Sequence, residues 1–395
     1  MLTMKKLILL SFIALYALSL KAQSYNVGHT SLTLDDPARN NRGVATEIYY
    51  PSLTNGDDVA VANGVFPYIV FGHGFIMGDV DYTNLSDVLV AKGYIVIFVT
   101  TCETVFSSDH ETFGLDLSFI CGQFYSLNFN QSSPFLGKID NKKAIMGHSM
   151  GGGCTVLAAK NNANINTIIC LSPMDTDPSS VAAAHLVNVP ALIICATGDS
   201  VCPAHSMGKP IYDSLASNCK VFLNIKGGGH CLFGNNSNAA CSLGESSSGS
   251  TITITSAQQN DVTLDFITPW LNYYLKNDYS SNVLFFDSLQ VSSRITYVNE
   301  CIITDISSQI INENNINCFV ENDNLNLDIK NPLQNNISIQ IFSLLGETQA
   351  YTVQSSDVTN EGSIRKTINI SNLAHGMYII KVSDRNKIYG LKFIK

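Results

Sequence analysis

A glycine-rich segment at residues 147–153 (GHSMGGG) constrains the fold of this chain more than any other stretch. Residues 143–146 (KAIM) predict a short buried strand before it, and residues 154–159 predict the first turns of a helix after it. A strand, a Gly-x-Ser-x-Gly turn and a helix in this order hold the serine on a sharp turn with its hydroxyl exposed. Glycines are needed there because side chains would collide with the neighbouring strand and helix. We therefore predict that Ser149 is a nucleophile, against the plainer interpretation that the segment is only a turn.

A serine hydroxyl reacts readily only when a base takes its proton and a carboxylate orients that base. On a scaffold of this kind the partners follow the serine in the chain, acid before histidine, on loops at the carboxyl ends of later strands. Asp199 follows the apolar strand predicted at 191–196, and His230 follows the strand predicted at 220–225. We predict that Asp199 is the acid and that His230 is the base, carried by a flexible loop of three glycines at 227–229.

Other titratable side chains have plainer interpretations. His148 lies inside the turn and is expected to pack beneath the site or to line it. His205 is expected on a helix surface or in a pocket wall. Asp175 and Asp177, after the strand that follows the turn, are reserve candidates for the acid. Asp116 is expected to be a solvated helix residue or to pair locally.

Negative charge develops on the carbonyl oxygen during attack, and two backbone N–H donors are needed to stabilise it. The amide of Met150 is expected at a helix N-terminus, where an anion is favoured. The second donor is expected from the loop after an early strand, residues 72–75 (GHGF), where Phe75 is best placed. The side chains of Phe75 and Met150 are then expected to line the acyl site.

The charge composition argues against several classes of partner. Only 14% of the 395 residues are charged, the net charge is −9, and no Lys/Arg run occurs. Because nucleic acids and anionic membranes are bound through basic patches, neither is an expected partner. Cys202, His205, His230 and Cys231 lack the usual spacing of zinc ligands, so no metal site is expected.

The pattern of apolar residues divides the chain into two folded regions. Strands alternating with helices of about 10–15 residues predict one α/β domain over residues 23–300, a parallel sheet with helices on both faces. The Asn-rich residues 301–316 are expected to form a linker. Short strands of alternating polarity follow, and they predict a small antiparallel β-sandwich over residues 317–395.

Residues 1–22 are predicted to be a signal peptide, because two lysines precede an apolar run that ends in a small-residue cleavage site. Export to an oxidising compartment lets disulfides persist, and the odd number of 11 cysteines leaves at least one thiol unpaired. Candidate pairs are Cys231 with Cys241 and Cys102 with Cys121. Three cysteines in apolar runs are expected to act as small buried hydrophobes: Cys154, Cys170 and Cys195.

Taken together, these motifs resemble the α/β-hydrolase superfamily. Within it they are most similar to cutinase-like polyesterases, bacterial poly(ethylene terephthalate) hydrolases, dienelactone hydrolases and platelet-activating-factor acetylhydrolase-like enzymes. The matching segments are residues 47–51, 72–75, 147–153, 197–199 and 229–230. An aromatic at Phe75 fits the polyesterases, which also tend to carry a tryptophan where this chain has Met174. That departure weakens an aromatic clamp on the substrate.

The C-terminal residues resemble the sorting domain of the type IX secretion system of Bacteroidetes. The matching segments are residues 341–346, 373–378 and 391–395. This resemblance implies passage through the periplasm and the outer membrane by the type IX machinery, followed by release or attachment to the cell surface. A sandwich that binds carbohydrate or another surface is the alternative.

The resemblance implies a secreted serine hydrolase of carboxylic esters that works through an acyl-enzyme and needs no metal or organic cofactor. Phe75, His148 and Met174 are expected to contact the substrate, and we expect a monomer. Polyesters are the first substrate class to consider, and short-acyl or lipid esters are the second. A non-catalytic exported surface protein that has kept the hydrolase fold is the alternative from another class.

Overall fold

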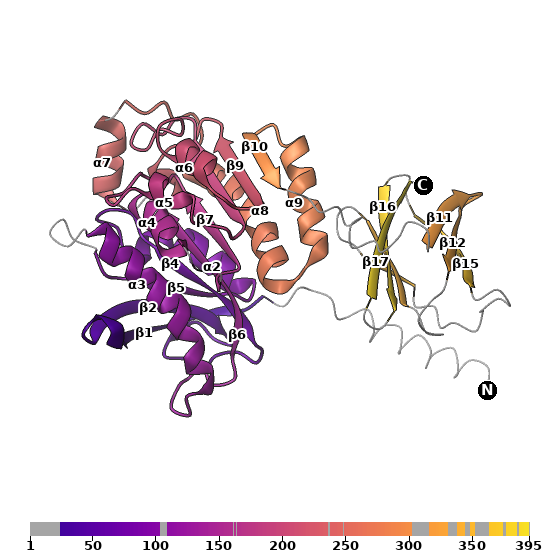
Figure 1. Ribbon diagram of the computed structural model, residues 1–395, viewed down its shortest axis with the longest axis horizontal. Helices are drawn as coiled ribbons and strands as arrows, with labels where there is room; N and C mark the ends of the chain where they lie inside the picture. The colour runs from indigo at the N-terminus through magenta and orange to yellow at the C-terminus, as the bar shows by residue number, and fades with distance from the viewer. Residues whose placement is uncertain are drawn as a thin grey trace. The chain divides into compact units, whose positions relative to one another are not determined.

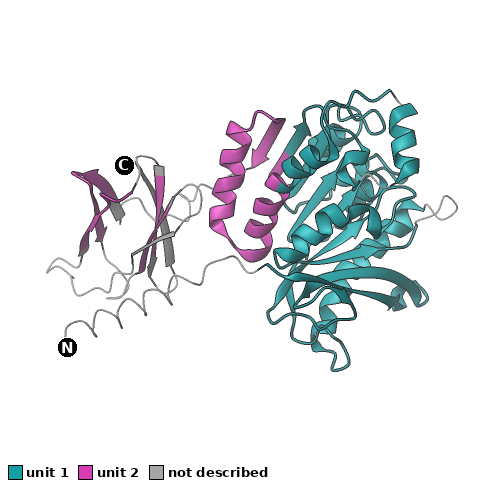
Figure 2. Ribbon diagram, turned by 180° about the vertical axis from the view of Figure 1, so that it is seen from behind, with its two compact units in different colours: residues 1–216, 222–264 teal, residues 217–221, 265–395 magenta. Residues whose placement is uncertain are grey.

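The computed structural model describes most of the chain as two compact units (Figure 2). Unit 1 comprises residues 1–216 and 222–264, and unit 2 comprises residues 217–221 and 265–395. The described residues are 24–102, 109–160, 162, 164–235, 238–247, 249–301, 316–330, 338–343, 348–351, 363–373, 377–384 and 387–394.

Unit 1 is built on a mostly parallel β-sheet, whose strands run in the order β9-β8-β7-β6-β4-β5-β2-β1-β3 (Figure 1). The five strands from β8 to β5 in this order are parallel to one another, whereas β2 pairs antiparallel with both β5 and β1. The strands are β1 (Asn26–Asp36), β2 (Arg42–Ser52), β3 (Gly56–Asp57), β4 (Phe66–Gly72), β5 (Ile95–Val99), β6 (Ile139–His148), β7 (Thr167–Leu171), β8 (Ala191–Ala196) and β9 (Cys219–Ile225).

Helices cover both faces of this sheet, because successive side chains of a strand point to opposite sides. Tyr68 and Val70 of β4 share a core with Phe113 and Val156, from two helices on one face. Phe71 of β4 instead contacts Tyr82, just before α2 on the other face. The helices are α2 (Thr83–Ala91), α3 (His110–Gln123), α4 (Met150–Ala159), α5 (Ser180–Ala184), α6 (Gly208–Ser214), α7 (Ala239–Ser247) and α8 (Ser256–Lys276). The α/β-hydrolase fold predicted from the sequence is therefore confirmed.

Unit 2 contains the end of α8, then α9 (Tyr279–Val291) and β10 (Ile295–Cys301), which neighbours β9. Neither α9 nor β10 was predicted from the sequence. The side chains of β10 are mostly exposed, so this strand lacks the apolar run that identified the central strands. A disulfide joins Cys301 at the end of β10 to Cys219 at the start of β9.

The predicted cysteine pairs had different outcomes. The disulfide between Cys231 and Cys241 is confirmed. The pair Cys102 and Cys121 was wrong: both thiols are free and buried, and Cys121 of α3 packs in the core as a small apolar side chain. The three cysteines predicted to be buried hydrophobes are indeed buried and unpaired: Cys154, Cys170 and Cys195.

The C-terminal part of unit 2 is the predicted antiparallel β-sandwich. Its two sheets have the strand orders β11-β12-β15 and β14-β13-β16-β17, with every printed pairing antiparallel. Alternate residues of both sheets, such as Leu327 of β12 and Ile380 of β16, meet in one core. The strands are β11 (Ile316–Glu321), β12 (Asn324–Lys330), β13 (Ser338–Ser343), β14 (Thr348–Tyr351), β15 (Ser363–Asn369), β16 (Met377–Asp384) and β17 (Lys387–Ile394).

The proposed signal peptide, residues 1–22, and most of the proposed linker, residues 302–315, lie outside the described residues. Within the described ranges, no helix combines the length and the apolarity that crossing a membrane requires.

Asp116 was expected to be solvated or to pair locally, and both alternatives were wrong. Its carboxylate is fully buried, and it accepts hydrogen bonds from Arg42 through Nε (3.0 Å) and Nη2 (2.9 Å) and from the Thr101 hydroxyl (2.7 Å). Arg39 adds a second cation, with Nη1 2.6 Å from Oδ1. Asp116 therefore fastens α3 to the start of β2. Arg42 lies 74 residues away in the chain, so no local pattern reveals this ion pair.

Replacing Asp116 by asparagine should lower the free energy of unfolding by about 3 kcal/mol, because Arg42 loses its buried counter-charge and Arg39 keeps only its ion pair with Asp36. Asp265→Asn is the matched control, since its ion pair with Arg294 is exposed and should contribute less than about 1 kcal/mol. Chemical denaturation followed by circular dichroism measures both values. Equal losses in the two variants would contradict this role for Asp116.

Candidate active site

Ser149 sits at the sharp turn between β6 and α4, as predicted. Its φ of 55° and ψ of −119° lie where non-glycine residues rarely occur, a conformation that costs on the order of 1–3 kcal/mol. Its amide donates to the carbonyl of Leu171 (2.9 Å), and its carbonyl accepts from the amide of Met174 (3.1 Å). Both ends of the strained residue are thus tied to β7 and the loop that follows it.

The glycines around Ser149 allow three backbone segments to come close together. A Cβ at Gly151 would lie 2.1 Å from the carbonyl oxygen of Gly72 in β4, and a Cβ at Gly147 would lie 2.2 Å from the carbonyl oxygen of Gly151. Neither contact can be relieved by turning a side chain, because both partners are backbone atoms. Glycine is therefore obligatory at these positions.

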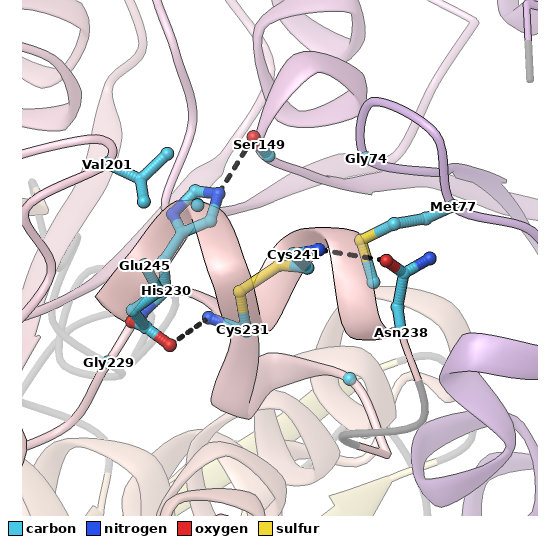
Figure 3. The surroundings of a disulfide bond; sticks show 12 residues. Gly74, Met77, Ser149, Val201, Gly229, His230, Cys231, Asn238, Cys241 and Glu245 are labelled. Carbon is cyan, nitrogen blue, oxygen red and sulfur yellow. Dashed lines mark hydrogen bonds between the residues drawn. A yellow bond between two sulfur atoms is a disulfide. The ribbon is translucent and has the colours of Figure 1, made fainter. Parts of the chain in front are cut away.

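The three predicted side chains meet at the carboxyl edge of the sheet. His230 Nε2 lies 2.9 Å from Ser149 Oγ, and His230 Nδ1 lies 2.8 Å from Asp199 Oδ2 (Figure 3). Because the carboxylate can only accept, Nδ1 carries the proton and Nε2 is left to accept the serine proton. All three residues are nearly shielded from solvent, with exposed fractions of 7% for Ser149, 3% for His230 and 5% for Asp199.

Asp199 is oriented by the backbone that follows it. Its second oxygen, Oδ1, accepts hydrogen bonds from the amides of Val201 (2.9 Å) and Cys202 (2.8 Å). Oδ2 is therefore the oxygen that remains to face His230. An ionised carboxylate buried in this way is stabilised by its donors, which suits it to hold an imidazole in one tautomer.

The Cys202 thiol is also a neighbour of the nucleophile. Burial, reinforced by the charge of Asp199, raises the pKa of Cys202 to about 12, while a hydrogen bond with the side chain of Ser149 acts in the opposite direction. The thiol is therefore protonated at neutral pH. It contributes no charge beside Ser149 and is no competing nucleophile.

The glycine loop that carries His230 was predicted to be flexible, but it is held in place. Gln259 of α8 is buried and binds Gly229 twice, with Oε1 accepting from its amide and Nε2 donating to its carbonyl, both at 2.9 Å. The amide of Gly198 donates to the carbonyl of Gly228 (2.8 Å). A Cβ at Gly228 would lie 2.3 Å from Gln259 Oε1. The glycines therefore allow Gln259 and neighbouring backbone to come close to this loop, and they do not make it flexible.

His148 was expected to pack beneath the site or to line it. Its side chain is completely buried, which agrees with the first alternative and contradicts the expected contact with substrate. Its Nε2 lies 3.1 Å from the carbonyl oxygen of His230, which can only accept, so Nε2 carries the proton. Its Nδ1 then accepts from the Tyr82 hydroxyl (2.9 Å), which itself accepts from the amide of Gly74 (2.9 Å). Burial, aided by the charge of His230, lowers the pKa of His148 well below its usual value, so the ring stays neutral. This chain connects the loop at 72–75 to the histidine loop.

The other predicted lining residues differ in exposure. Phe75 is 46% exposed, as a lining side chain must be, and Met174 is half-buried against the core. The side chain of Met150 is completely buried in the core, so the expectation that it lines the acyl site was wrong. The predicted use of the Phe75 and Met150 amides as oxyanion donors stays a prediction.

The alternative titratable residues lie in other roles. The Asp175 carboxylate accepts from the hydroxyls of Ser179 and Ser180, at the start of α5. Asp177 precedes a cis proline, and its amide donates to His110 Nδ1 (3.1 Å). His205 is exposed in a turn that precedes α6, so its expected place on a helix was wrong.

One of the four residues considered as zinc ligands in the sequence has another partner. Cys231 is occupied by its disulfide, and no group of three or more His, Cys, Asp or Glu side chains in the described ranges is placed to hold a metal ion.

Several contributors to the site were missed in the sequence. Tyr82, Gln259 and Glu245 each support the loops around His230 through buried hydrogen bonds. Glu245 and Gln259 lie in polar stretches where nothing distinguishes a buried acceptor from a solvated one. Their nearness to His230 arises only from folding.

Comparison with known proteins finds two families. Residues 24–280 match the PET hydrolase-like family, and residues 321–395 match the secretion system C-terminal sorting domain. A bis(hydroxyethyl) terephthalate hydrolase from Streptomyces coelicolor is 29% identical over 187 residues, which cover 46% of this chain and 54% of that protein.

Two cutinases give similar values. Cutinase 1 from Thermobifida cellulosilytica is 28% identical over 185 residues, covering 46% of this chain and 64% of that protein. A cutinase from Thermobifida fusca is 28% identical over 185 residues and is covered to 56%. The chain thus spans between about half and two thirds of the length of the curated relatives it matches.

Replacing Gly151 by alanine should lower the free energy of unfolding by about 3 kcal/mol or prevent folding, because the added methyl must push α4 away from β4. Gly122→Ala in α3 is the matched control, since a Cβ there meets nothing within 4 Å. That variant should be stabilised by up to about 1 kcal/mol. Denaturation curves of both variants test the difference, and a Gly151→Ala protein as stable as the wild type would refute the steric argument.

Proposed function

This chain belongs to the PET hydrolase-like family, and we propose that it is an exported serine hydrolase of carboxylic esters that works through an acyl-enzyme. The observation that carries the proposal is the unbroken hydrogen-bond chain from Ser149 Oγ through His230 to Asp199, with distances of 2.9 and 2.8 Å. The relatives named as cutinases and as a bis(hydroxyethyl) terephthalate hydrolase support the reaction class.

The reaction begins when Ser149 Oγ attacks the ester carbonyl carbon and His230 Nε2 takes the hydroxyl proton. The tetrahedral intermediate then collapses as the imidazolium gives this proton to the leaving alcohol, which leaves an acyl-enzyme. Water repeats the sequence, with His230 taking a proton from water, and releases the acid and free Ser149. Asp199 keeps the imidazole in the tautomer that this cycle needs and stabilises the imidazolium.

The amides of Phe75 and Met150 are the proposed donors to the oxyanion. Met150 is the first residue of α4, so its amide points outward at a helix N-terminus where a negative charge is favoured. The oxyanion would form close to this amide, because Met150 directly follows the attacking Ser149. Losing one such donor typically costs about 10²–10³ in turnover.

An open apolar surface beside the triad favours polymeric or bulky esters. Phe75 and Val201 are apolar side chains with exposed fractions of 46% and 37%, and they come from the loops that follow β4 and β8. Val201 lies next to the imidazole of His230 in Figure 3. Met174 provides only a half-buried thioether where polyesterases tend to carry a tryptophan, so short-acyl or lipid esters are the second candidate class.

The C-terminal match supports export by a secretion system, with the type IX machinery as the proposed partner and the cell surface or the extracellular medium as the destination. A non-catalytic surface protein is the alternative from another class. The strained backbone of Ser149 argues against it, because strain of this kind clusters at functional sites.

A fluorophosphonate probe, which labels activated serines, tests the proposal. Labelling should be complete in the wild type and lost in Ser149→Ala, whose ester hydrolysis should fall by about 10⁴–10⁶-fold. Phe75→Ala should keep its labelling, because the amide donor survives, and should change mainly the ratio of rates between short and bulky esters. Equal loss of activity in both variants would contradict the assignment of Phe75.

A substrate panel from p-nitrophenyl acetate through long-chain esters to amorphous polyester film separates the substrate classes. If polyesters are substrates, Met174→Trp should raise the rate on film by several-fold relative to p-nitrophenyl acetate, because a flat ring adds contact area for an aromatic repeat unit. Thermal denaturation of the variant controls for misfolding. No release from film by either the wild type or Met174→Trp would assign the protein to short or lipid esters.

A further inference from the structure

A buried carboxylate holds the backbone of the proposed base. The amides of His230 and Cys231 both donate to Glu245 of α7, the first to Oε1 and the second to Oε2 at 3.2 Å. Glu245 is only 5% exposed, and Figure 3 shows it directly behind His230. A Cβ at Gly229 would lie 2.5 Å from Glu245 Oε1, so the glycine before His230 is what admits the carboxylate.

The charge of Glu245 is costly to bury, which indicates that it does more than fill space. Burial raises the pKa of Glu245, and the amides of His230 and Cys231 together with the charge of His230 act in the opposite direction, while Asp199 adds repulsion. Gln259 fastens the neighbouring Gly229 with a neutral amide, so holding the loop does not by itself require a charge. Unlike that neutral amide, the carboxylate of Glu245 also interacts electrostatically with the imidazole of His230.

A disulfide fixes Glu245 relative to His230. Cys231, the residue after His230, is bonded to Cys241 in the first turn of α7, one turn before Glu245. The histidine loop and α7 are thus joined covalently by the disulfide and non-covalently by the carboxylate. In Figure 3 the two sulfur atoms lie between the loop and the helix.

Asn238, just before α7, holds the loop that carries Phe75. Asn238 Nδ2 donates to the carbonyl of Ile76 (2.8 Å) and to Asp81 Oδ2 (3.2 Å), and Asn238 Oδ1 accepts from the amide of Cys241 (2.9 Å). Ile76 has a φ of 56°, which is strained for a β-branched residue and needs such support. Residues 238–245, which we call the brace, therefore contact both sides of the catalytic machinery.

We infer that Glu245 is a positioning residue for His230 and that the brace sets the distance between the imidazole and the loop at 72–78. The inference rests on the proposed function. Glu245 does not touch the substrate. It orients the backbone from which the imidazole projects, and its negative charge favours the protonated imidazole that forms as Ser149 attacks. A misplacement of about 1 Å in such a group can cost on the order of 100-fold in rate.

The test compares Glu245→Ala and Glu245→Gln with the wild type, using Ser246→Ala, an exposed residue of the same helix, as the matched control. With p-nitrophenyl acetate, kcat should fall by about 100-fold in Glu245→Ala and by about 10-fold in Glu245→Gln, which keeps one acceptor oxygen, while KM stays within about twofold. Ser246→Ala should match the wild type.

The pH profile separates positioning from a merely structural role. Glu245→Gln removes a negative charge from beside the imidazole, so protonation of the base becomes less favourable and the acid limb of kcat/KM should move to lower pH. The other ionisable groups at the site are Asp199, which is unchanged, His148, whose buried ring stays neutral, and Cys202, whose buried thiol stays protonated. A lower kcat with an unmoved acid limb would assign Glu245 to folding stability alone and overturn the inference.

Circular dichroism and thermal denaturation show whether each variant folds. If Glu245→Ala does not, the isosteric Glu245→Gln and the double variant Cys231→Ser/Cys241→Ser carry the test, and kcat of the latter should fall by about 10-fold. Cys219→Ser/Cys301→Ser, which removes the other disulfide, should keep the kcat of the wild type. Folded Glu245 variants with kcat within twofold of the wild type would overturn the inference. A wild type that neither binds the fluorophosphonate probe nor hydrolyses any ester would instead contradict the proposed function.

Discussion

The site depends on how closely helix α4 approaches strand β4. The backbones of Gly72 and Gly151 touch, and only the absence of two Cβ atoms permits it. This approach forces the chain to turn within one residue, and Ser149 is left in a strained conformation with its hydroxyl at the sheet edge. The amide of Ser149 donates to the carbonyl of Leu171, and the amide of Met174 donates to the carbonyl of Ser149, so both sides of the strained residue are held by β7 and the loop after it. The proposed nucleophile is therefore positioned by the packing of the fold itself, without a contribution from substrate.

The proposed acid and base, Asp199 and His230, are placed by a different means. They lie on loops after β8 and β9, and such loops would be mobile if they were not tied down. Two amides orient Asp199, Gln259 holds Gly229, and Glu245 holds His230. The neutral ring of His148 also donates a hydrogen bond to the carbonyl of His230. The two proposed catalytic side chains are thus held on loops by buried hydrogen bonds to their own atoms or to the neighbouring backbone.

The sequence allowed the α/β fold, the sandwich and the positions of Ser149, Asp199 and His230 to be predicted, because each rests on a local pattern of apolar runs and glycines. It failed where a role depends on partners distant in the chain. Asp116 was expected to be solvated or to pair locally because its partner Arg42 lies 74 residues away. For His148 the sequence left two places open, because a turn motif does not say on which side its second residue points. Cys102 and Cys121 were paired as loop cysteines, whereas Cys121 lies in α3 with its side chain in the core.

The disulfide between Cys219 and Cys301 has a consequence for survival outside the cell. It closes a covalent ring whose two ends are 82 residues apart in the chain, and this ring includes His230, Cys241 and Glu245. A single cut by an extracellular protease anywhere between residues 219 and 301 leaves both fragments joined through the sulfurs. The fragment that contains His230 then stays covalently bonded to the fragment that contains Ser149, so a single cleavage does not separate them.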